Sequence, residues 1–276
     1  MRAMLVCALG DLTLDVIVRL TGPVAAGGDT DAEIRIGPGG QAANVAAWAA
    51  ELGAAARFVG KTGADEAGDL VRSKLAAHGV DVCGPIQGRN GSICSIVSPD
   101  GDRSMAADRG SARELRVDEL DRAWFTDCDV LHVSGYALMH EPVRSAAIHA
   151  GELARSAGAG ITTDLASWSA IRDSGVAAFG EALGALAPGV VFATAEEERV
   201  LGRSLVDAFW IVKHGARGCS FGEDEREARP VEQVLDTTGA GDALAAGWIV
   251  GGPELALDAA ARCVQQVGAM PLASPT

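Results

Sequence analysis

The chain has 276 residues, of which 48% are hydrophobic, and a formal net charge of −14 at pH 7. These values predict a globular protein with a sizeable core and argue against disorder. The apolar runs are shorter than the roughly 20 residues that a membrane span needs, and the acidic balance without Lys/Arg patches disfavours nucleic acid and anionic membranes as partners.

The N-terminal segment MRAMLVCALGD contains an apolar run that Gly10 and Asp11 interrupt before a secretory signal could form. The six cysteines are scattered without CxxC or metal-ligand spacing, so we expect reduced, mostly buried thiols and no structural zinc. Both features favour a cytoplasmic location.

The first half of the chain alternates between strands and helices. We expect a buried strand at 5–9, and the Gly-broken, partly alternating segment 15–36 predicts the exposed strands of a small β element. Helices are predicted at 41–52 and 65–78, each ending at a glycine and followed by a strand, ARFVG and VDV respectively. The segment 91–109 predicts a hairpin around the turn signal PDGD, and we expect it to join the earlier β element.

In the second half, the segments DVLHVSG, GITTDL, VVFATA and FWIVKHG alternate with helical stretches. This alternation is typical of a parallel sheet with helices on both faces. The segment 236–248 leads into a long apolar helix, and ALDAAARCVQQVGA predicts another. Ligands of such sheets bind at the carboxyl ends of the strands, which here are Ser134-Gly135, Asp164, Thr194 and Lys213-His214-Gly215.

Two glycine-rich segments do not match common nucleotide-binding motifs. FVGKTG contains Gly-Lys-Thr, but Ala55 stands where a phosphate-binding loop needs its first glycine, and GPGGQAAN does not have the spacing GxGxxG. A third segment, DTTGAGDALAAGW, places Asp242 directly after Gly-Ala-Gly at the start of a helix. Asp242 either complements the helix dipole or belongs to an anion pocket formed by the N–H groups of the turn.

Five regions, in order, resemble the ribokinase-like (PfkB) carbohydrate kinases over nearly the whole chain. They are GPGGQAANVAAWAAELG, ARFVGKTGADEAGDLVRSKLAAHGVDV, VVFATAEEERVLG, IVKHGARGCSF and DTTGAGDALAAGW. The resemblance implies an α/β fold, with a ribokinase-like three-layer α/β/α core around a mostly parallel sheet and a small β-sheet lid that excludes water from the sugar. The core would comprise 1–14, 37–90 and 110–276, and the lid 15–36 and 91–109.

The resemblance also implies an ATP-dependent phosphotransferase that acts, with Mg²⁺, on a hydroxyl of a small sugar. Such a reaction needs an acceptor for the hydroxyl proton and positive potential where charge accumulates. Asp242 would be the general base, and the N–H groups of Gly239, Ala240 and Gly241 would hold the phosphoryl oxygens. The sugar would be bound by Asp15, by the backbone of Gly39 and Gly40 and by Asn44, with Asp11, Arg103 and Arg109 as further candidates.

Several of these residues have an ordinary structural alternative. Asp15 could cap a turn beside the first strand, and Asn44 could bond the backbone in the first turns of its helix. Arg103 and Arg109 lie on or after the predicted hairpin, where solvated surface arginines are common.

The residues that would bind the nucleotide and its metal ion depart in part from the usual sequence pattern of the family. Thr194 stands where the family has the Asn of Asn-x-x-Glu, whereas Glu197 keeps its place and would reach Mg²⁺ through water. Lys213 stands where ribokinases often have Thr, and it either supplies positive charge to ATP or is an ordinary lysine at a strand end. Gly215 and Gly218 would belong to the nucleotide-binding loop.

The resemblance leaves a cation and the substrate open. Asp236 and the carbonyl of Thr238 match positions that bind a monovalent cation, such as K⁺, in some relatives. The substrate could be a pentose, a hexose or a keto-sugar acid. A nucleoside kinase is a weaker alternative, because segments 15–36 and 91–109 contain no aromatic residue on which a base could stack.

Two expectations concern activity and assembly. A catalytically silent sugar- or nucleotide-binding regulator is disfavoured because Asp242 and the glycines before it are intact. Because unpaired strand edges invite association, the lid predicts a homodimer that forms through the two lids.

Overall fold

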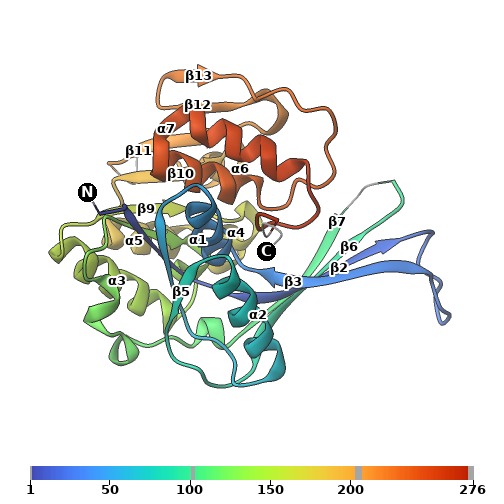
Figure 1. Cartoon of the computed structure of the whole chain (residues 1–276), viewed down its shortest axis with the longest axis horizontal. Coiled ribbons are helices and arrows are strands. Elements are labelled where there is room, and N and C mark those ends of the chain that lie inside the picture. The colour runs from blue at the N-terminus through green and yellow to red at the C-terminus, as the bar shows by residue number, and fades with distance from the viewer. Residues whose placement is uncertain (1, 101–102, 203–206, 273–276) are drawn as a thin grey trace.

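A mostly parallel sheet forms the centre of this computed structural model, which describes residues 2–100, 103–202 and 207–272 (Figure 1). Within these residues the sheet has nine strands in the order β13-β12-β11-β10-β9-β8-β1-β4-β5. All neighbours from β11 to β5 pair in parallel, and β12 and β13 add an antiparallel edge. The strands are β1 (Leu5–Leu9), β4 (Ala55–Val59), β5 (Val80–Cys83), β8 (Val130–Ser134), β9 (Gly160–Asp164), β10 (Val190–Thr194), β11 (Phe209–Lys213), β12 (Cys219–Phe221) and β13 (Asp224–Arg226).

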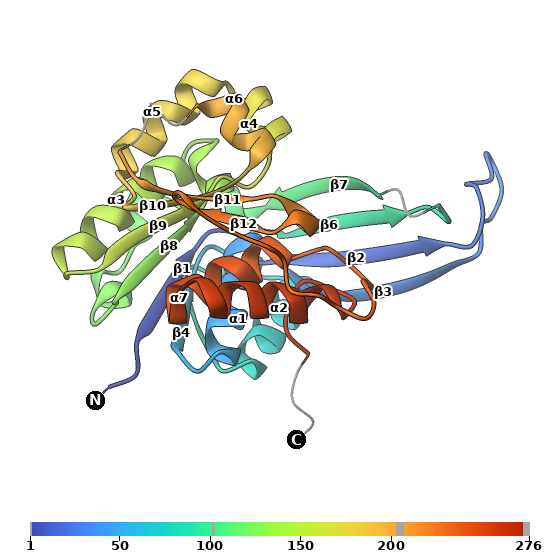
Figure 2. The same ribbon diagram turned by 90° about the horizontal axis from the view of Figure 1, so that it is seen from above.

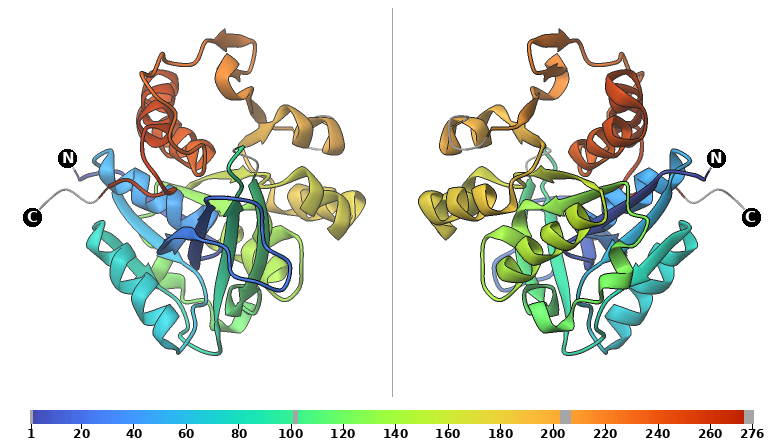
Figure 3. Two further views of the ribbon diagram at one scale, coloured as in Figure 1. Left: turned by 90° about the vertical axis from the view of Figure 1, so that its right-hand side faces the viewer. Right: turned by 90° about the vertical axis from the view of Figure 1, so that its left-hand side faces the viewer.

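Two layers of helices cover the sheet, one on each face (Figure 2). Seen end-on, the same two layers lie on opposite sides of the strands (Figure 3). Because both faces are covered, strands such as β1 and β8 are almost completely buried, and β1 (LVCAL) is a continuous apolar run rather than an alternating one. The predicted three-layer α/β/α fold is therefore confirmed. One layer contains α1 (Gln41–Glu51), α2 (Glu66–Ala77) and α7 (Ala240–Val264), and the other α3 (Val143–Ser156), α4 (Trp168–Ser174), α5 (Val176–Leu186) and α6 (Ala195–Leu201).

A second, four-stranded sheet extends away from the core (Figure 2). Its strands are β3 (Ala32–Gly39), β2 (Thr13–Leu20), β6 (Asn90–Val97) and β7 (Arg103–Gly110), in that order across the sheet. The predicted hairpin thus joins the earlier β element through the parallel pairing of β2 with β6. We call this sheet the lid; the division of the chain into core and lid at the predicted bounds stays a prediction.

The helical segments differ from the expectations in detail. The stretch before Leu186 divides into α4 and α5 at Gly175, which has a φ of 97° that an L side chain rarely adopts. The final element, α7, consists of two helical segments that meet at a kink, where Gly252 has non-helical dihedral angles (φ 79°) and Pro253 follows, in agreement with the two helices predicted there. The short β12–β13 hairpin and three 3₁₀ turns between 111 and 125 were not predicted, because elements of three or four residues carry no periodic signal. In the described part of the chain, no helix has the length and apolar character needed to span a bilayer.

Candidate active site

The centre of the site is the first turn of α7. Gly239 precedes it with a φ of 79°, and a Cβ atom there would lie 2.5 Å from the Cβ of Ala269. Only glycine is therefore compatible with this turn. The first bond inside the helix joins the N–H of Ala243 to the carbonyl of Gly239, so the amides of Gly241 and Asp242 have no partner within the helix. The N–H of Ala240 contacts the carbonyl of Thr237 at 3.4 Å.

Asp242 projects from this turn toward α1. Its Oδ2 accepts a hydrogen bond of 2.7 Å from Nδ2 of Asn44, whose Oδ1 is buried and has no partner among the described residues. Burial, together with the charge of Asp164, raises the pKa of Asp242 to about 8, although the bond from Asn44 and the charge of Lys213 act in the opposite direction. The side chain of Asn44 therefore bonds to Asp242 and not to the backbone of its own helix.

Lys213 lies directly beside the same turn. Its Nζ is 2.5 Å from Oδ2 of the buried Asp164, and it would be 3.1 Å from a Cβ atom placed on Gly241. Burial alone would lower the pKa of Lys213, but the carboxylates of Asp164 and Glu197 outweigh it, and the pKa is raised. Lys213 is thus a charged, ion-paired group next to the glycine turn and not a solvated lysine at a strand end.

The predicted sugar residues Asp15 of β2 and Gly39 of β3 lie close together, and Gly40 follows directly. Thr13 Oγ1 donates to Asp15 Oδ1 at 2.8 Å, and a Cβ atom on Gly39 would lie 2.1 Å from the Asp15 carboxyl group. At Gly40, φ is 101° and a Cβ atom would lie 2.3 Å from the carbonyl oxygen of Asp11. Burial raises the pKa of Asp15 to about 6, against the opposing effect of the bond from Thr13. Glycine at position 39 lets the backbone approach the Asp15 carboxylate closely, and glycine at position 40 lets it approach the backbone at Asp11.

Arg109 forms a buried ion pair with Asp11, and the two side chains are 11% and 5% exposed. Its guanidinium carbon also lies 3.4 Å from the ring centroid of Tyr136. The alternative of a solvated surface arginine is therefore wrong for Arg109, because its charge joins β7 of the lid to the core after β1 and β8. The side chain of Arg103 lies outside the described residues.

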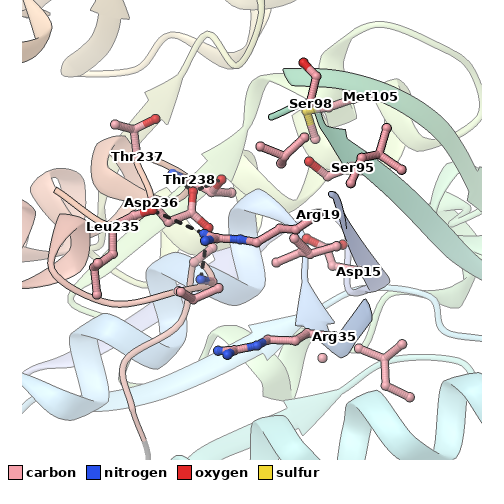
Figure 4. Close-up of a pocket in the computed structure, with 18 of the residues that line it drawn as sticks. Asp15, Arg19, Arg35, Ser95, Ser98, Met105, Leu235, Asp236, Thr237 and Thr238 are labelled. Carbon is pink, nitrogen blue, oxygen red and sulfur yellow. Dashed lines mark hydrogen bonds between the residues drawn. The ribbon is translucent and has the colours of Figure 1, made fainter. Parts of the chain in front are cut away.

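A cavity of about 790 Å³ opens between the lid and the loop that precedes α7 (Figure 4). Its walls include Asp15 and two lid arginines, Arg19 and Arg35, and none of its lining residues is aromatic. On the core side it is lined by the segment 234–238 and by residues 267–269.

A second cavity, of about 720 Å³, lies on the other side of the glycine turn. The four residues predicted for the nucleotide, Thr194, Lys213, Gly215 and Gly218, all line it. Its far wall is apolar and comes largely from α7: Leu244, Leu257, Ala260, Ala261 and Val264. Val234 and Thr237 line both cavities, so the two meet next to the first turn of α7.

A family model for pfkB family carbohydrate kinases matches residues 3–275. The chain belongs to this family. It is 32% identical over 264 residues to fructokinase-1 of Oryza sativa subsp. japonica, covering 88% of this chain and 81% of the relative. It is also 32% identical over 279 residues to an ATP-dependent ribose-1-phosphate kinase of Halopiger xanaduensis, covering 94% and 90%. The structure of Arabidopsis thaliana ribokinase complexed with ribose and ATP has a similar fold, with a TM-score of 0.78, 22% identity and coverage of 98% and 96%.

Glu197 and Thr194 form a capping box at the start of α6 in this carbohydrate kinase. Oε2 of Glu197 accepts from the N–H of Thr194 at 2.7 Å, and Thr194 Oγ1 accepts from the N–H of Glu197 at 3.2 Å. Glu197 is 4% exposed, and burial raises its pKa although the charge of Lys213 acts against this shift. Among the described residues, no cluster of three or more His, Cys, Asp or Glu side chains could hold a metal ion by itself.

Asp236 organises the loop before α7. Its Oδ1 accepts from the N–H and the hydroxyl of Thr238, at 2.9 and 2.6 Å, and its Oδ2 accepts from the N–H of Gly268 at 3.1 Å. The carbonyl of Thr238 accepts from Sγ of Cys263 at 3.4 Å. Asp236 and Thr238, the two residues predicted to bind a monovalent cation, thus lie next to each other. The carboxylate of Asp236 fixes the turn through its hydrogen bonds.

The structure adds residues to the site that the sequence patterns did not single out as ligands. The position of Asp164 near the site could be predicted because it stands at the carboxyl end of β9. Its ion pair with Lys213 could not be predicted from the sequence. Tyr136 and Arg19 belong to no recognisable sequence motif. The alternation of side chains along β2 nevertheless places Arg19 on the same face as Asp15.

Proposed function

We propose that this carbohydrate kinase transfers the γ-phosphoryl group of ATP to a hydroxyl of a small sugar, with Asp242 as the general base. The observation that carries the proposal is the junction of the two cavities at the first turn of α7. A sugar in the first cavity and a triphosphate in the second would meet beside Asp242 and the backbone amides of the turn. Such a meeting point is what an in-line phosphoryl transfer requires.

The protein's own groups supply a proton acceptor and a positive potential. Asp242 takes the proton of the sugar hydroxyl as the oxygen attacks phosphorus, and Asn44 keeps the carboxylate oriented. The amides of Gly239, Ala240 and Gly241, together with the ammonium group of Lys213, stabilise the charge on the phosphoryl oxygens. The raised pKa of Asp242 is consistent with a base whose proton affinity is matched to neutral pH.

The second cavity is our proposed ATP site. The Arabidopsis ribokinase structure of the same fold was solved with ATP, and the apolar wall from α7 suits an adenine ring. Mg²⁺ fits this site because the ion is usually held by one or two carboxylates together with substrate phosphates, and the carboxylates of Asp164, Glu197 and Asp242 surround Lys213 beside the glycine turn. Glu197 would hold it through water, and the ion would neutralise phosphate charge. Asp236 and the Thr238 carbonyl are our proposed site for K⁺.

The first cavity is our proposed sugar site, with the sugar at its Asp15 end. Gly39, Gly40 and Asn44, which do not line the cavity itself, would bind further hydroxyl groups beyond Asp15. Relatives of the chain are named for fructose and ribose 1-phosphate, which supports a sugar. A nucleoside is disfavoured because no aromatic side chain lines the cavity. A silent binding protein is disfavoured because such a protein would not need a buried carboxylate with a raised pKa at the junction.

We also propose that the kinase is a cytoplasmic homodimer that forms through the lids. The lid strands have a second face, opposite the one that lines the cavity. This outer face carries Val16, Val18, Cys94, Ile34 and Ile96, and the two isoleucines are exposed. An exposed apolar face of this kind marks an interaction surface. A second copy would cover it.

An ADP-release assay over pentoses, hexoses, keto-sugar acids, sugar phosphates and nucleosides tests the activity. We expect ATP-dependent turnover of at least one sugar and little turnover of nucleosides. If no sugar gives turnover, while calorimetry still detects binding of ATP, the binding-protein alternative would replace the kinase.

A further inference from the structure

The cavity under the lid is longer than a simple sugar requires. Asp15 and Arg19 lie on the same face of β2, four residues apart, which corresponds to about 13 Å between their Cα atoms. The volume of about 790 Å³ falls in the upper part of the ~300–1,000 Å³ range of drug-sized ligand sites. A sugar bound at Asp15 would leave room for a further group at the Arg19 end.

Arg19 has an incomplete set of partners. Its Nη2 donates to the carbonyl of Leu235 at 3.2 Å, while its Nε is buried and has no hydrogen-bond partner among the described residues. Within those residues Arg19 also forms no ion pair with a carboxylate. Arg19 is partly buried, and its buried Nε–H lacks an acceptor within the described part of the chain. A buried donor without a partner is costly, so the site favours the arrival of an anion that can accept from it.

Arg35 supplies a second guanidinium group from the neighbouring strand β3. It is paired with Glu33 at 2.6 Å, and both side chains are 58% exposed. An exposed pair of this kind contributes little free energy, so Arg35 can exchange Glu33 for a ligand. Figure 4 shows Arg19 and Arg35 extending from the lid strands in the same direction, toward the side of the loop at Leu235 and Asp236.

We infer that Arg19 and Arg35 bind an oxyanion carried by the sugar, at the end of the cavity away from Asp15. The substrate class is therefore a sugar phosphate or a sugar acid, and this inference rests on the proposed sugar kinase activity. Guanidinium groups bind phosphate and carboxylate through two parallel charge-assisted hydrogen bonds, which gives both affinity and orientation. Asp15 contacts the hydroxyl groups, and the arginines select for charge.

Another role for Arg19 is structural. Its bond to Leu235 connects the lid with the loop before α7, so a variant could lose activity because the lid is displaced. This role would affect neutral and anionic sugars equally, whereas an anion site affects their ratio. The ratio of kcat/KM for matched substrates therefore separates the two roles.

The test uses substrate pairs matched apart from the anionic group: ribose with ribose 1-phosphate, fructose with fructose 1-phosphate, and the open-chain polyol 2-deoxyglucitol with 2-deoxygluconate. We expect the anionic member of at least one pair to have a kcat/KM about tenfold or more above that of its neutral partner. In Arg19→Gln and Arg35→Gln this ratio falls by about 10- to 100-fold. Arg19→Lys retains an intermediate ratio, because it keeps the charge and loses the planar fork. Arg122→Gln, an exposed arginine outside both cavities, keeps the parental ratio.

Equal or better use of the neutral sugars would overturn the inference while leaving the kinase activity intact. An equal loss for both members of a pair in Arg19→Gln would assign Arg19 to the structural role. If no sugar is turned over, the kinase proposal fails, and calorimetry with the same sugar phosphates and acids decides the anion site: binding that weakens in Arg19→Gln supports it, and binding that does not respond contradicts it. The preferred pair distinguishes phosphate from carboxylate.

Discussion

The side-chain amide of Asn44 donates a 2.7 Å hydrogen bond to the carboxylate of Asp242, which joins α1 to the first turn of α7. The bond links the two segments that carry the strongest sequence signatures, 198 residues apart in the chain. It stabilises the ionised form of Asp242, whose pKa burial raises to about 8. Asn44 is therefore positioned to control how much of the proposed base is deprotonated at neutral pH.

This relationship predicts a shift in the pH profile of Asn44→Ala. A raised pKa means that the base form of Asp242 is gained as pH rises, so kcat/KM for the sugar should increase with pH up to a plateau above about 8. Loss of the amide removes an effect that lowers the pKa, so the acidic limb should move upward by about one to two pH units. Steady-state rates from pH 5.5 to 9.5 measure this shift, with Glu51→Gln at the end of the same helix as the control. An unchanged limb with a uniformly lower rate would show that Asn44 only binds the sugar.

The pair of Lys213 and Asp164 predicts a separation of stability from activity. Lys213→Met leaves a buried carboxylate without its partner and should lower the free energy of unfolding by about 3–5 kcal/mol. It should also lower kcat by about 10²–10³-fold, because the positive potential at the phosphoryl group is lost. Adding Asp164→Asn to this variant should recover much of the stability and none of the turnover. Denaturant unfolding and kcat measurements compare the two proteins; recovery of kcat in the double variant would exclude Lys213 from a direct role.

The capping box at α6 predicts that substitutions at Thr194 and Glu197 have different effects on the Mg²⁺ requirement. Asn is as good a helix N-cap as Thr, so Thr194→Asn should fold normally and either retain its turnover or need less Mg²⁺. Gln can replace Glu in a capping box, so Glu197→Gln should also fold, but it should need a higher Mg²⁺ concentration for half-maximal turnover. Titration of Mg²⁺ at fixed ATP measures both. Parental Mg²⁺ dependence in Glu197→Gln would remove this residue from the proposed metal site.

The outer face of the lid predicts dissociation of the dimer in Ile34→Lys. Ile34 is 62% exposed, and a charge in the centre of an apolar interface should separate the copies. Light scattering at micromolar concentration should give the mass of a dimer for the parent and of a monomer for the variant. Trp168→Lys, which changes an exposed apolar residue of the core, should remain a dimer. A monomeric parent would contradict the proposed assembly.

The sequence patterns predicted the layers of the fold and the lid because both rest on repeating signals. Parallel strands appear as continuous apolar runs and lid strands as alternating ones, and Gly39, Gly40 and Gly239 mark places where a side chain would collide with the backbone or its neighbours. Contacts between distant segments have no such signal. The pairing of Lys213 with Asp164 and of Arg109 with Asp11, and the position of Arg19 opposite Leu235, depend on how the lid and the two helix layers come together.

The central claim is that Asp242 acts as a base and is not merely an acid that complements the helix dipole. Asp242→Asn retains the size and the hydrogen-bonding shape of the side chain, so the fold should persist. Because the folded-state pKa is raised, ionisation of Asp242 costs stability as pH rises from about 4 toward about 8. The variant should therefore unfold with a free energy equal to that of the parent at low pH and higher than that of the parent at pH 8, and calorimetry should show parental ATP affinity.

The most direct measurement is kcat of folded Asp242→Asn on the best sugar at saturating ATP. Loss of a general base predicts a decrease of about 10²–10⁴-fold without a matching change in ATP binding. A kcat equal to that of the parent protein would contradict the proposed mechanism.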